Sequence, residues 1–179
     1  MKFIKTEIEG VYIIEPRIFK DDRGYFFESF SDAKFKEAGL DYTFVQDNQA
    51  FSAYGTLRGL HFQKGEHAQA KLVRVIEGAV IDVAVDLRPN SSTYGKHVAV
   101  ELSGENNRQL LIPRGFAHGY SVISKTALFA YKCDNFYCKE AEAGLNFADS
   151  ELGIDWKISD SDINANERDR NFPLLKELK

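Results

Sequence analysis

The chain has 179 residues, of which 44% are hydrophobic and fourteen are Phe, enough to build the core of one domain over residues 1–179. Its formal net charge of −4 argues against a general nucleic-acid or membrane-surface role, so any anion site must come from a local cluster of cations. With no signal-type N-terminus and no segment of membrane-spanning length, we expect a cytoplasmic protein without nucleic-acid or membrane partners.

Short strands predominate along the chain. In chain order, we predict strands over residues 11–15, 25–30, 44–51, 56–62, 71–77, 79–87, 97–102, 109–113, 119–123 and 127–133. Ser31 is expected to cap a short helix over residues 32–38, which Gly39 stops. From residue 149 the chain loosens into short helical turns and polar loops.

The period of two is clear where Ile81, Val83 and Val85 alternate with Asp82 and Ala84. Many short strands with Gly-rich turns favour an all-β sandwich or jelly-roll barrel. We find no internal repeat, linker or low-complexity segment. The sequence therefore predicts one barrel.

The two cysteines, Cys133 and Cys138, could form a disulfide or half of a metal site. In a chain without a secretory signal, two free thiols, buried or half-buried, are the expected case.

Residues 55–71 combine four ionisable groups, Arg58, His61, His67 and Lys71, in one strand–turn–strand passage. A cation and an imidazole on a short strand suit an anionic ligand and a proton transfer. The competing interpretation is a sheet edge with solvated charges. Apolar neighbours in the same strand favour a place in the core instead.

Polar residues also recur in other predicted strands or beside them. A candidate lining for a polar barrel interior consists of Arg23, Glu28, Gln46, Asn48, Arg58, His61, Lys71, Asp82, His118 and Tyr131. Buried charge without partners is costly, so a polar interior indicates a functional site. The alternative is that these residues belong to separate solvated faces.

Four runs carry a resemblance. DRGYFFES at residues 22–29, FVQDN at 44–48, LRGLHFQ at 57–63 and PRGFAHG at 113–119 resemble the signature runs of the dTDP-4-dehydrorhamnose 3,5-epimerase family. The similarity extends from about residue 14 to residue 169. It implies a cupin-type jelly roll with a few short peripheral helices, and a homodimer that exchanges N-terminal strands. It also implies the substrate dTDP-4-dehydro-6-deoxyglucose, on the route to dTDP-rhamnose. We expect no cofactor and no metal.

The implied chemistry has a physical rationale. A 4-keto group acidifies the protons on C3 and C5, and inversion needs a base, an acid and a group that stabilises the enolate. His61 is the natural base and Lys71 suits the enolate oxygen. The resemblance assigns Tyr131 as the proton donor and Asp169 as the carboxylate that orients His61. Asp160 and Asp162 are alternative candidates for that carboxylate.

The resemblance also implies the groups that bind substrate. They are Arg23, Phe26, Glu28, Gln46, Asn48, Arg58, His118, Tyr137, Glu142 and Arg168. The guanidinium groups of Arg23, Arg58 and Arg168 suit phosphate oxygens. Tyr137 corresponds to the residue that stacks on thymine, and Phe26 is expected to line the pocket.

Other functions stay open. Metal-dependent cupins pair a His-x-His and Glu set with a later His, and the later half is present up to His118. The first set falls on Gly65, His67 and Lys71, where Gly cannot ligate and a protonated Lys repels a cation. A non-catalytic sugar-nucleotide-binding barrel gives no reason for a base and an acid. Epimerisation at one carbon only is a further alternative.

Overall fold

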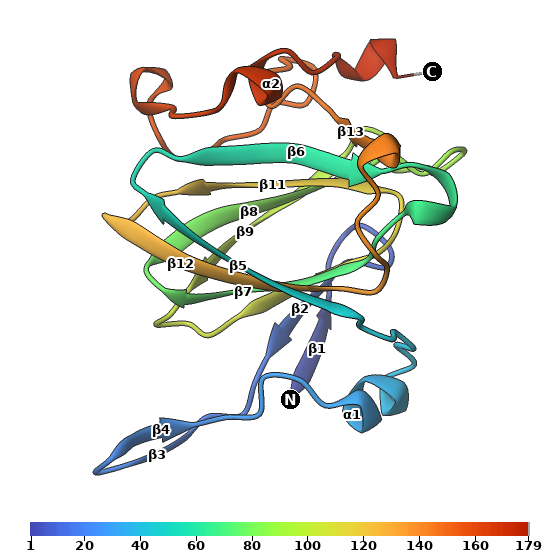
Figure 1. Cartoon of the computed structure of the whole chain (residues 1–179). Helices are drawn as coiled ribbons and strands as arrows, with labels where there is room; N and C mark the ends of the chain where they lie inside the picture. Colours follow the sequence, from blue (N-terminus) through green and yellow to red (C-terminus); the bar gives the residue numbers. More distant parts are fainter. Residues whose placement is uncertain (179) are drawn as a thin grey trace.

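Two antiparallel sheets lie face to face and close into a barrel in this computed structural model (Figure 1), which describes residues 1–178. Residue 179, the last residue of the expected domain, lies outside the described residues. The first sheet has the order β1 (Lys2–Lys5), β2 (Tyr12–Glu15), β10 (Gln109–Ile112), β7 (Lys71–Glu77), β12 (Thr126–Cys133), β5 (Gln46–Ala53). The second has the order β13 (Glu142–Gly144), β6 (Leu57–Gln63), β11 (Phe116–Val122), β8 (Ala79–Asp86), β9 (His97–Ser103). The predicted all-β, cupin-type jelly roll is confirmed.

The remaining elements lie outside the barrel. β3 (Phe19–Asp21) and β4 (Gly24–Phe26) form a separate hairpin that extends away from the sheets, α1 (Asp32–Glu37) follows it, and α2 (Glu167–Arg170) lies over β6 (Figure 1). Four 3-10 turns cover Gly65–His67, Lys139–Ala141, Asp160–Asp162 and Leu175–Glu177. Within residues 1–178, no helix is long and apolar enough to cross a membrane.

Most predicted strands form within two or three residues of their expected bounds, and β7 matches its prediction. The strand predicted over residues 25–30 is wrong, because β4 ends at Phe26 and has only β3 to pair with. β1, β3 and β13 were not predicted, since three or four residues give too little periodicity. Ser31 occupies the N-cap position of α1, but its side chain makes no capping hydrogen bond, so that part of the prediction is wrong.

Three apolar clusters hold the layers together. One fills the barrel between the sheets, and a second lies outside β6, β11 and β8 under the C-terminal segment. The third joins α1 to the outer side of β2, β7 and β10 through Phe35. Each sheet therefore has apolar contacts on both faces, which at roughly 25 cal/mol per Å² of apolar surface supplies most of the driving force for folding.

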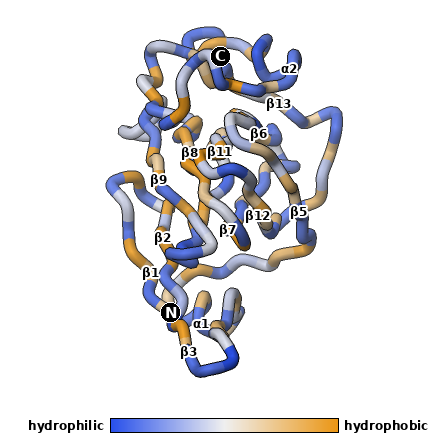
Figure 2. The backbone as a smooth tube through the Cα atoms, turned by 90° about the vertical axis from the view of Figure 1, so that its left-hand side faces the viewer, coloured by the Kyte–Doolittle hydropathy of each residue, from blue (hydrophilic) through white to orange (hydrophobic). Residues whose placement is uncertain are grey.

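β8 shows how this arrangement frees the barrel interior for polar groups. Ile81, Val83 and Val85 point outward into the cluster beneath the C-terminal segment, whereas Ala84 and Asp82 point inward. Nearly every residue of β8 is buried, and Figure 2 colours the strand as largely hydrophobic. A carboxylate can therefore stand inside the barrel without leaving β8 short of apolar contacts.

β6 and β11 approach unusually closely at a pair of glycines. Gly59 has φ +137°, and a Cβ added there would lie 2.6 Å from Gly119 Cα and 3.0 Å from His118 O. A Cβ on Gly119 would lie 2.7 Å from Arg58 O. Both positions thus require glycine, and the approach sets where the next residues of β6 stand relative to β11.

Replacement of Gly59 by Ala tests this approach. We expect Gly59→Ala to lower the free energy of unfolding by about 2 kcal/mol or more, because the new methyl group adds a clash with backbone to the strain of a positive φ. Gly39→Ala is the matched control, since Gly39 has φ +77° but nothing within 4 Å of an added Cβ. Urea unfolding of both variants measures the difference, and equal losses would contradict the role of the close approach.

Candidate active site

His61, on β6, forms a buried pair with Asp169, on α2. His61 Nε2 lies 2.8 Å from Asp169 Oδ1, and the Gly59 N–H donates to Asp169 Oδ2 at 3.1 Å. The carboxylate side chain is fully buried, while His61 keeps about a quarter of its side chain exposed. Asn166 caps α2 by accepting from the Asp169 N–H at 2.7 Å, which fixes the backbone that carries the carboxylate.

The pair determines which ring nitrogen of His61 is free. A carboxylate only accepts hydrogen bonds, so neutral His61 carries its proton on Nε2 and leaves the lone pair on Nδ1. Arg168 Nη2 lies 3.3 Å from the same Nε2, but a guanidinium cannot accept that proton, so this is a close contact rather than a hydrogen bond. His61 can therefore take a proton through Nδ1.

Opposing effects set the pKa of Asp169. Burial alone would raise the pKa, but the hydrogen bond from His61, the charge of His61, the Gly59 N–H and the nearby Arg168 together hold it below its ordinary value. The carboxylate is thus ionised at neutral pH.

Lys71 on β7 and Tyr131 on β12 stand on adjacent strands, pointing into the barrel. Burial lowers the pKa of Lys71, and the neighbouring Cys133, Asp82 and Glu142 act against that shift. Burial raises the pKa of Tyr131, so its hydroxyl keeps its proton at neutral pH. The site thus holds a buried lysine on the strand next to a phenol that can donate a proton.

A cavity of about 110 Å³ joins these groups to His61. Its lining consists of Gln46, Asn48, His61, Phe62, Gln63, Gln69, Lys71, Tyr131, Cys133, Tyr137 and Glu142. The Tyr137 hydroxyl donates to Glu142 at 3.0 Å, and Arg168 forms an ion pair with the same carboxylate at 3.0 Å. Seven of the residues singled out in the sequence therefore meet around one cavity, and Arg168 lies at its rim.

Three candidates lie on the β3–β4 hairpin or just after it, away from this cavity. Arg23, in the turn of the β3–β4 hairpin, pairs with Asp21, and Glu28 pairs with Lys34. Phe26 is 69% exposed on the same hairpin. Figure 1 places that hairpin beyond the first sheet, at the opposite end of the molecule from α2 and β6.

The other candidates have separate surroundings. Arg58 is exposed on β6, where its Nε donates to Ser52 Oγ at 3.2 Å. His118 is more than nine-tenths buried. Of the alternative carboxylates, Asp162 accepts from the Tyr54 hydroxyl at 3.2 Å and Asp160 is exposed in a 3-10 turn, so neither contacts His61.

Sequence reasoning missed four residues that line the cavity: Phe62, Gln63, Gln69 and Cys133. Gln63 follows His61 by two positions and Cys133 follows Tyr131 by two, so alternation along a strand could have found both. Cys133 is buried and Cys138 half-buried, both free, as predicted. Gln69 lies before β7 and carried no such signal.

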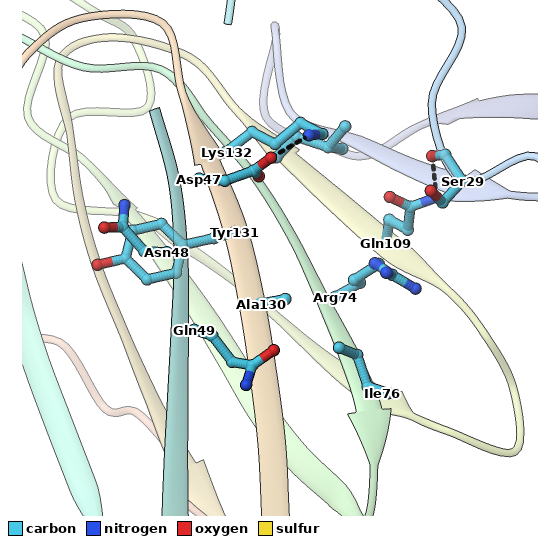
Figure 3. Close-up of a pocket in the computed structure, with 11 residues that line it drawn as sticks. Ser29, Asp47, Asn48, Gln49, Arg74, Ile76, Gln109, Ala130, Tyr131 and Lys132 are labelled. Carbon is cyan, nitrogen blue, oxygen red and sulfur yellow. Dashed lines mark hydrogen bonds and ion pairs between the residues drawn. The ribbon is translucent and has the colours of Figure 1, made fainter. Parts of the chain in front are cut away.

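The outer side of the first sheet is also hollowed. Figure 3 shows Tyr131 and Asn48 on one side of the sheet, and Gln49, Arg74 and Ile76 on the other. That outer hollow has a volume of about 290 Å³. Its Gln109 side chain donates to the Ser29 carbonyl at 2.8 Å, which ties the segment after the hairpin to β10.

The part of the chain that the structure describes contains no group of three or more His, Cys, Asp or Glu side chains placed to hold a metal ion. His67, a position of interest for the metal-dependent alternative, lies in a 3-10 turn with 44% of its side chain exposed. The groups that do converge are a histidine–carboxylate pair, an ammonium and a phenol. Fold and site together define a cupin-type barrel enzyme for acid–base chemistry.

Comparison with known proteins identifies the family. A family model described as dTDP-4-dehydrorhamnose 3,5-epimerase matches residues 5–177. The enzyme of that name from Methanothermobacter thermautotrophicus is 50% identical over 177 residues, which cover 98% of this chain and 95% of that protein. The chain belongs to the dTDP-4-dehydrorhamnose 3,5-epimerase family.

Solved structures agree with this assignment. The dTDP-4-dehydrorhamnose 3,5-epimerase of Elizabethkingia anophelis superposes with a TM-score of 0.96 at 57% identity, covering 99% of this chain and 98% of that one. The dTDP-6-deoxy-D-glucose-3,5-epimerase of Legionella pneumophila, solved in complex with dTDP-4-keto-L-rhamnose, has a TM-score of 0.95 at 45% identity. The alignment with the Legionella enzyme covers 99% of this chain and 94% of that chain.

The lowered pKa of Asp169 predicts how the stability of the fold depends on pH. Because the folded-state pKa lies below the unfolded-state value, the ionised carboxylate stabilises the fold above that unfolded value, and the stabilisation is lost as pH falls through the folded pKa. We expect Asp169→Asn to lower the free energy of unfolding at pH 7 by roughly 1–3 kcal/mol. The difference from the unmodified protein should shrink on acidification.

Urea unfolding from pH 7 down to pH 3 measures this difference. Asp155→Asn is the control, because Asp155 forms an exposed ion pair with Lys157 and should contribute far less. A loss for Asp169→Asn that stayed constant over the whole pH range would show that the negative charge of Asp169 does not stabilise the fold.

Proposed function

We infer that this protein is a dTDP-4-dehydrorhamnose 3,5-epimerase. It converts dTDP-4-dehydro-6-deoxy-D-glucose to dTDP-4-dehydro-L-rhamnose by inverting C3 and C5, a step of dTDP-rhamnose biosynthesis. The observation that carries this inference is the placement of the His61–Asp169 pair, Lys71 and Tyr131 in one barrel, in a chain of this family. Epimerisation at a single carbon is the nearest alternative.

We propose His61 as the base. The C4 carbonyl of the substrate acidifies the hydrogens on C3 and C5, which both stand axial on one face of a glucopyranose chair. A single base on that face can therefore serve both carbons. Nδ1 of His61 takes the proton, and ionised Asp169 stabilises the imidazolium that results.

Lys71 and Tyr131 complete the reaction in this proposal. Removing either proton leaves negative charge on the C4 oxygen, and the Lys71 ammonium stabilises it in the low-dielectric barrel interior. Tyr131 returns a proton from the opposite face, which inverts the carbon. Its raised pKa keeps that proton available at neutral pH.

The nucleotide part of the substrate has binding groups at the rim. Arg58 and Arg168 supply cations for the phosphates, and Tyr137 supplies a ring for thymine. Tyr137 is 56% exposed, and its hydroxyl is held by Glu142, so its ring is available for stacking. Gln46, Asn48, Glu142 and His118 are proposed to contact the sugar.

We propose a homodimer in which the hairpin of one copy completes the site of the other. Phe19 and Phe26 pair across the hairpin at 6.5 Å, and Tyr25 stacks on Phe27 at 5.9 Å, yet three of these rings are half-exposed or more. A lone two-stranded hairpin is marginal in water, so these rings need a covering surface. Arg23 would reach the site in the same way.

The remaining expectations stand as part of this proposal. The enzyme needs no metal or cofactor, because Lys71, His61 and Asp169 supply the charges that the reaction requires. It works in the cytoplasm on a nucleotide sugar, without nucleic-acid or membrane partners. A metal-dependent reaction would be revealed by loss of activity on dialysis against a chelator.

Deuterium exchange tests the activity directly. On incubation with dTDP-4-dehydro-6-deoxyglucose in deuterated water, we expect two deuterium atoms per product molecule, at C3 and C5, with inversion at both. Mass spectrometry and NMR count and place them. Exchange at one carbon only would replace the proposal by a single-carbon epimerase, and none at all would end it.

Two variants test which residue transfers the proton on each face of the sugar ring. His61→Asn should lower exchange at both carbons by at least about a hundredfold, the usual contribution of a general base. Tyr131→Phe should allow exchange with little inversion, because the imidazolium that took the proton is then the only acid. Full inversion by Tyr131→Phe would remove Tyr131 from the mechanism.

Mixed dimers test the shared site. Arg23→Glu alters the β3–β4 hairpin and His61→Asn removes the base, so each variant alone should be nearly inactive. If the hairpin serves the partner, co-expression of the two variants restores activity to about a quarter of the sites, because half of the dimers are mixed and each mixed dimer holds one intact site. If the hairpin served its own chain, no activity would be recovered.

A further inference from the structure

A second buried histidine–carboxylate pair lies beside the first. Asp82 on β8 is fully buried, and both of its oxygens lie close to His118 Nε2 on β11, at 3.1 and 2.9 Å. His118 is the cross-strand partner of His61 in the β6–β11 ladder, so the two imidazoles rise from neighbouring strands. The proposed reaction needs only one base, which leaves this pair without a part in proton transfer.

The pair determines the protonation of the His118 ring. Burial lowers the pKa of His118, Asp82 opposes that shift, and the neighbouring Lys71 and His61 add to it, so the ring is neutral at neutral pH. Asp82 can only accept a hydrogen bond, which requires the single proton of the neutral ring to stand on Nε2. Nδ1 is then an acceptor and cannot donate.

Nδ1 of His118 has no hydrogen-bond partner in residues 1–178. By contrast, every fully buried side-chain nitrogen or oxygen of those residues has a partner. Nδ1 is therefore not fully buried, and the cross-strand pairing with His61 places the His118 ring on the same face of the sheet as that base. An unpaired acceptor in that place suits a donor brought by a ligand, and the hydroxyl groups of a sugar are such donors.

We propose that Asp82 is a positioning residue that holds His118 in the Nε2–H form, and that His118 thereby accepts a hydrogen bond from a hydroxyl of the bound sugar. The second half rests on the proposed function; the first does not. The arrangement has a chemical advantage over a carboxylate that faced the sugar directly. The imidazole offers the same acceptor while keeping the full negative charge one ring farther from the enolate oxygen.

Asp82 also balances charge inside the barrel. Its carboxylate lies near enough to Lys71 to support the ammonium against the effect of burial. Within the described residues its hydrogen bonds go to His118 alone. The carboxylate thus orients one polar group of the site and favours the charged form of another.

Nitrogen-15 NMR of the free enzyme tests the first half. The chain has four histidines, and the signals of His118 are those that a His118→Gln variant lacks. At pH 7 we expect His118 protonated on Nε2 only, with that proton shifted downfield by the Asp82 carboxylate. A proton on Nδ1, or on both nitrogens, would overturn the proposal.

Variants at position 82 link the signal to the carboxylate. Asp82→Asn, whose neutral amide oxygen is a weaker acceptor, should move the downfield proton upfield, while Asp82→Glu, which keeps a carboxylate, should retain a downfield proton. Asp155→Asn, at an exposed ion pair, should leave the spectrum of His118 unchanged. An unshifted His118 proton in a folded Asp82→Asn protein would overturn the role of Asp82, and Asp82→Glu provides the comparison if Asp82→Asn does not fold.

Binding measurements test the second half. For the unmodified enzyme, a dTDP-sugar that lacks the recognised hydroxyl should bind about tenfold more weakly than its parent, the usual effect of one hydrogen bond. In Asp82→Leu, which removes the acceptor that holds the proton on Nε2, that difference should shrink for the same analogue. Equal sensitivity of both proteins to every deoxy analogue would overturn the hydroxyl contact. Failure of the proposed function would appear separately, as absence of dTDP-sugar binding with the NMR result intact.

Discussion

The buried Asp169 carboxylate is the interaction on which the site depends. Removing such a charge from water is costly, and it is tolerated here because His61 and the Gly59 N–H both donate to it while Arg168 lies nearby. The same contacts attach the C-terminal segment to β6. That segment is also held by an apolar cluster outside the second sheet, so packing and electrostatics place the carboxylate together.

The jelly roll provides a polar interior without losing apolar burial. Both sheets are covered on their outer faces, one by the C-terminal segment and the other in part by α1. The inner face can then carry Asp82, Lys71 and His118 alongside valines and phenylalanines of the central cluster. The glycines that let β6 approach β11 bring two imidazoles side by side within this interior.

Much of the fold could be predicted from the sequence, because alternation is strong in strands such as β7 and β8. The site was predictable in part: His61 and Lys71 stood out by type, whereas the roles of Tyr131 and Asp169 rested on resemblance. Local sequence could not choose among Asp160, Asp162 and Asp169, because a contact across 108 residues depends on how the C-terminal segment packs. The detachment of the β3–β4 hairpin was equally hidden, since aromatic residues usually predict burial.

The long sequence separation within the site has a kinetic consequence. The contacts of Asp169 with His61 and Gly59 span 108 and 110 residues, so they close very large loops. Chains dominated by such distant pairings fold slowly, and the pairings become favourable only once most of the topology exists. A partly folded chain could contain β7 and β12 correctly paired and still lack an oriented imidazole. Recovery of enzymatic turnover during refolding would therefore report completion of the whole barrel rather than of any single sheet.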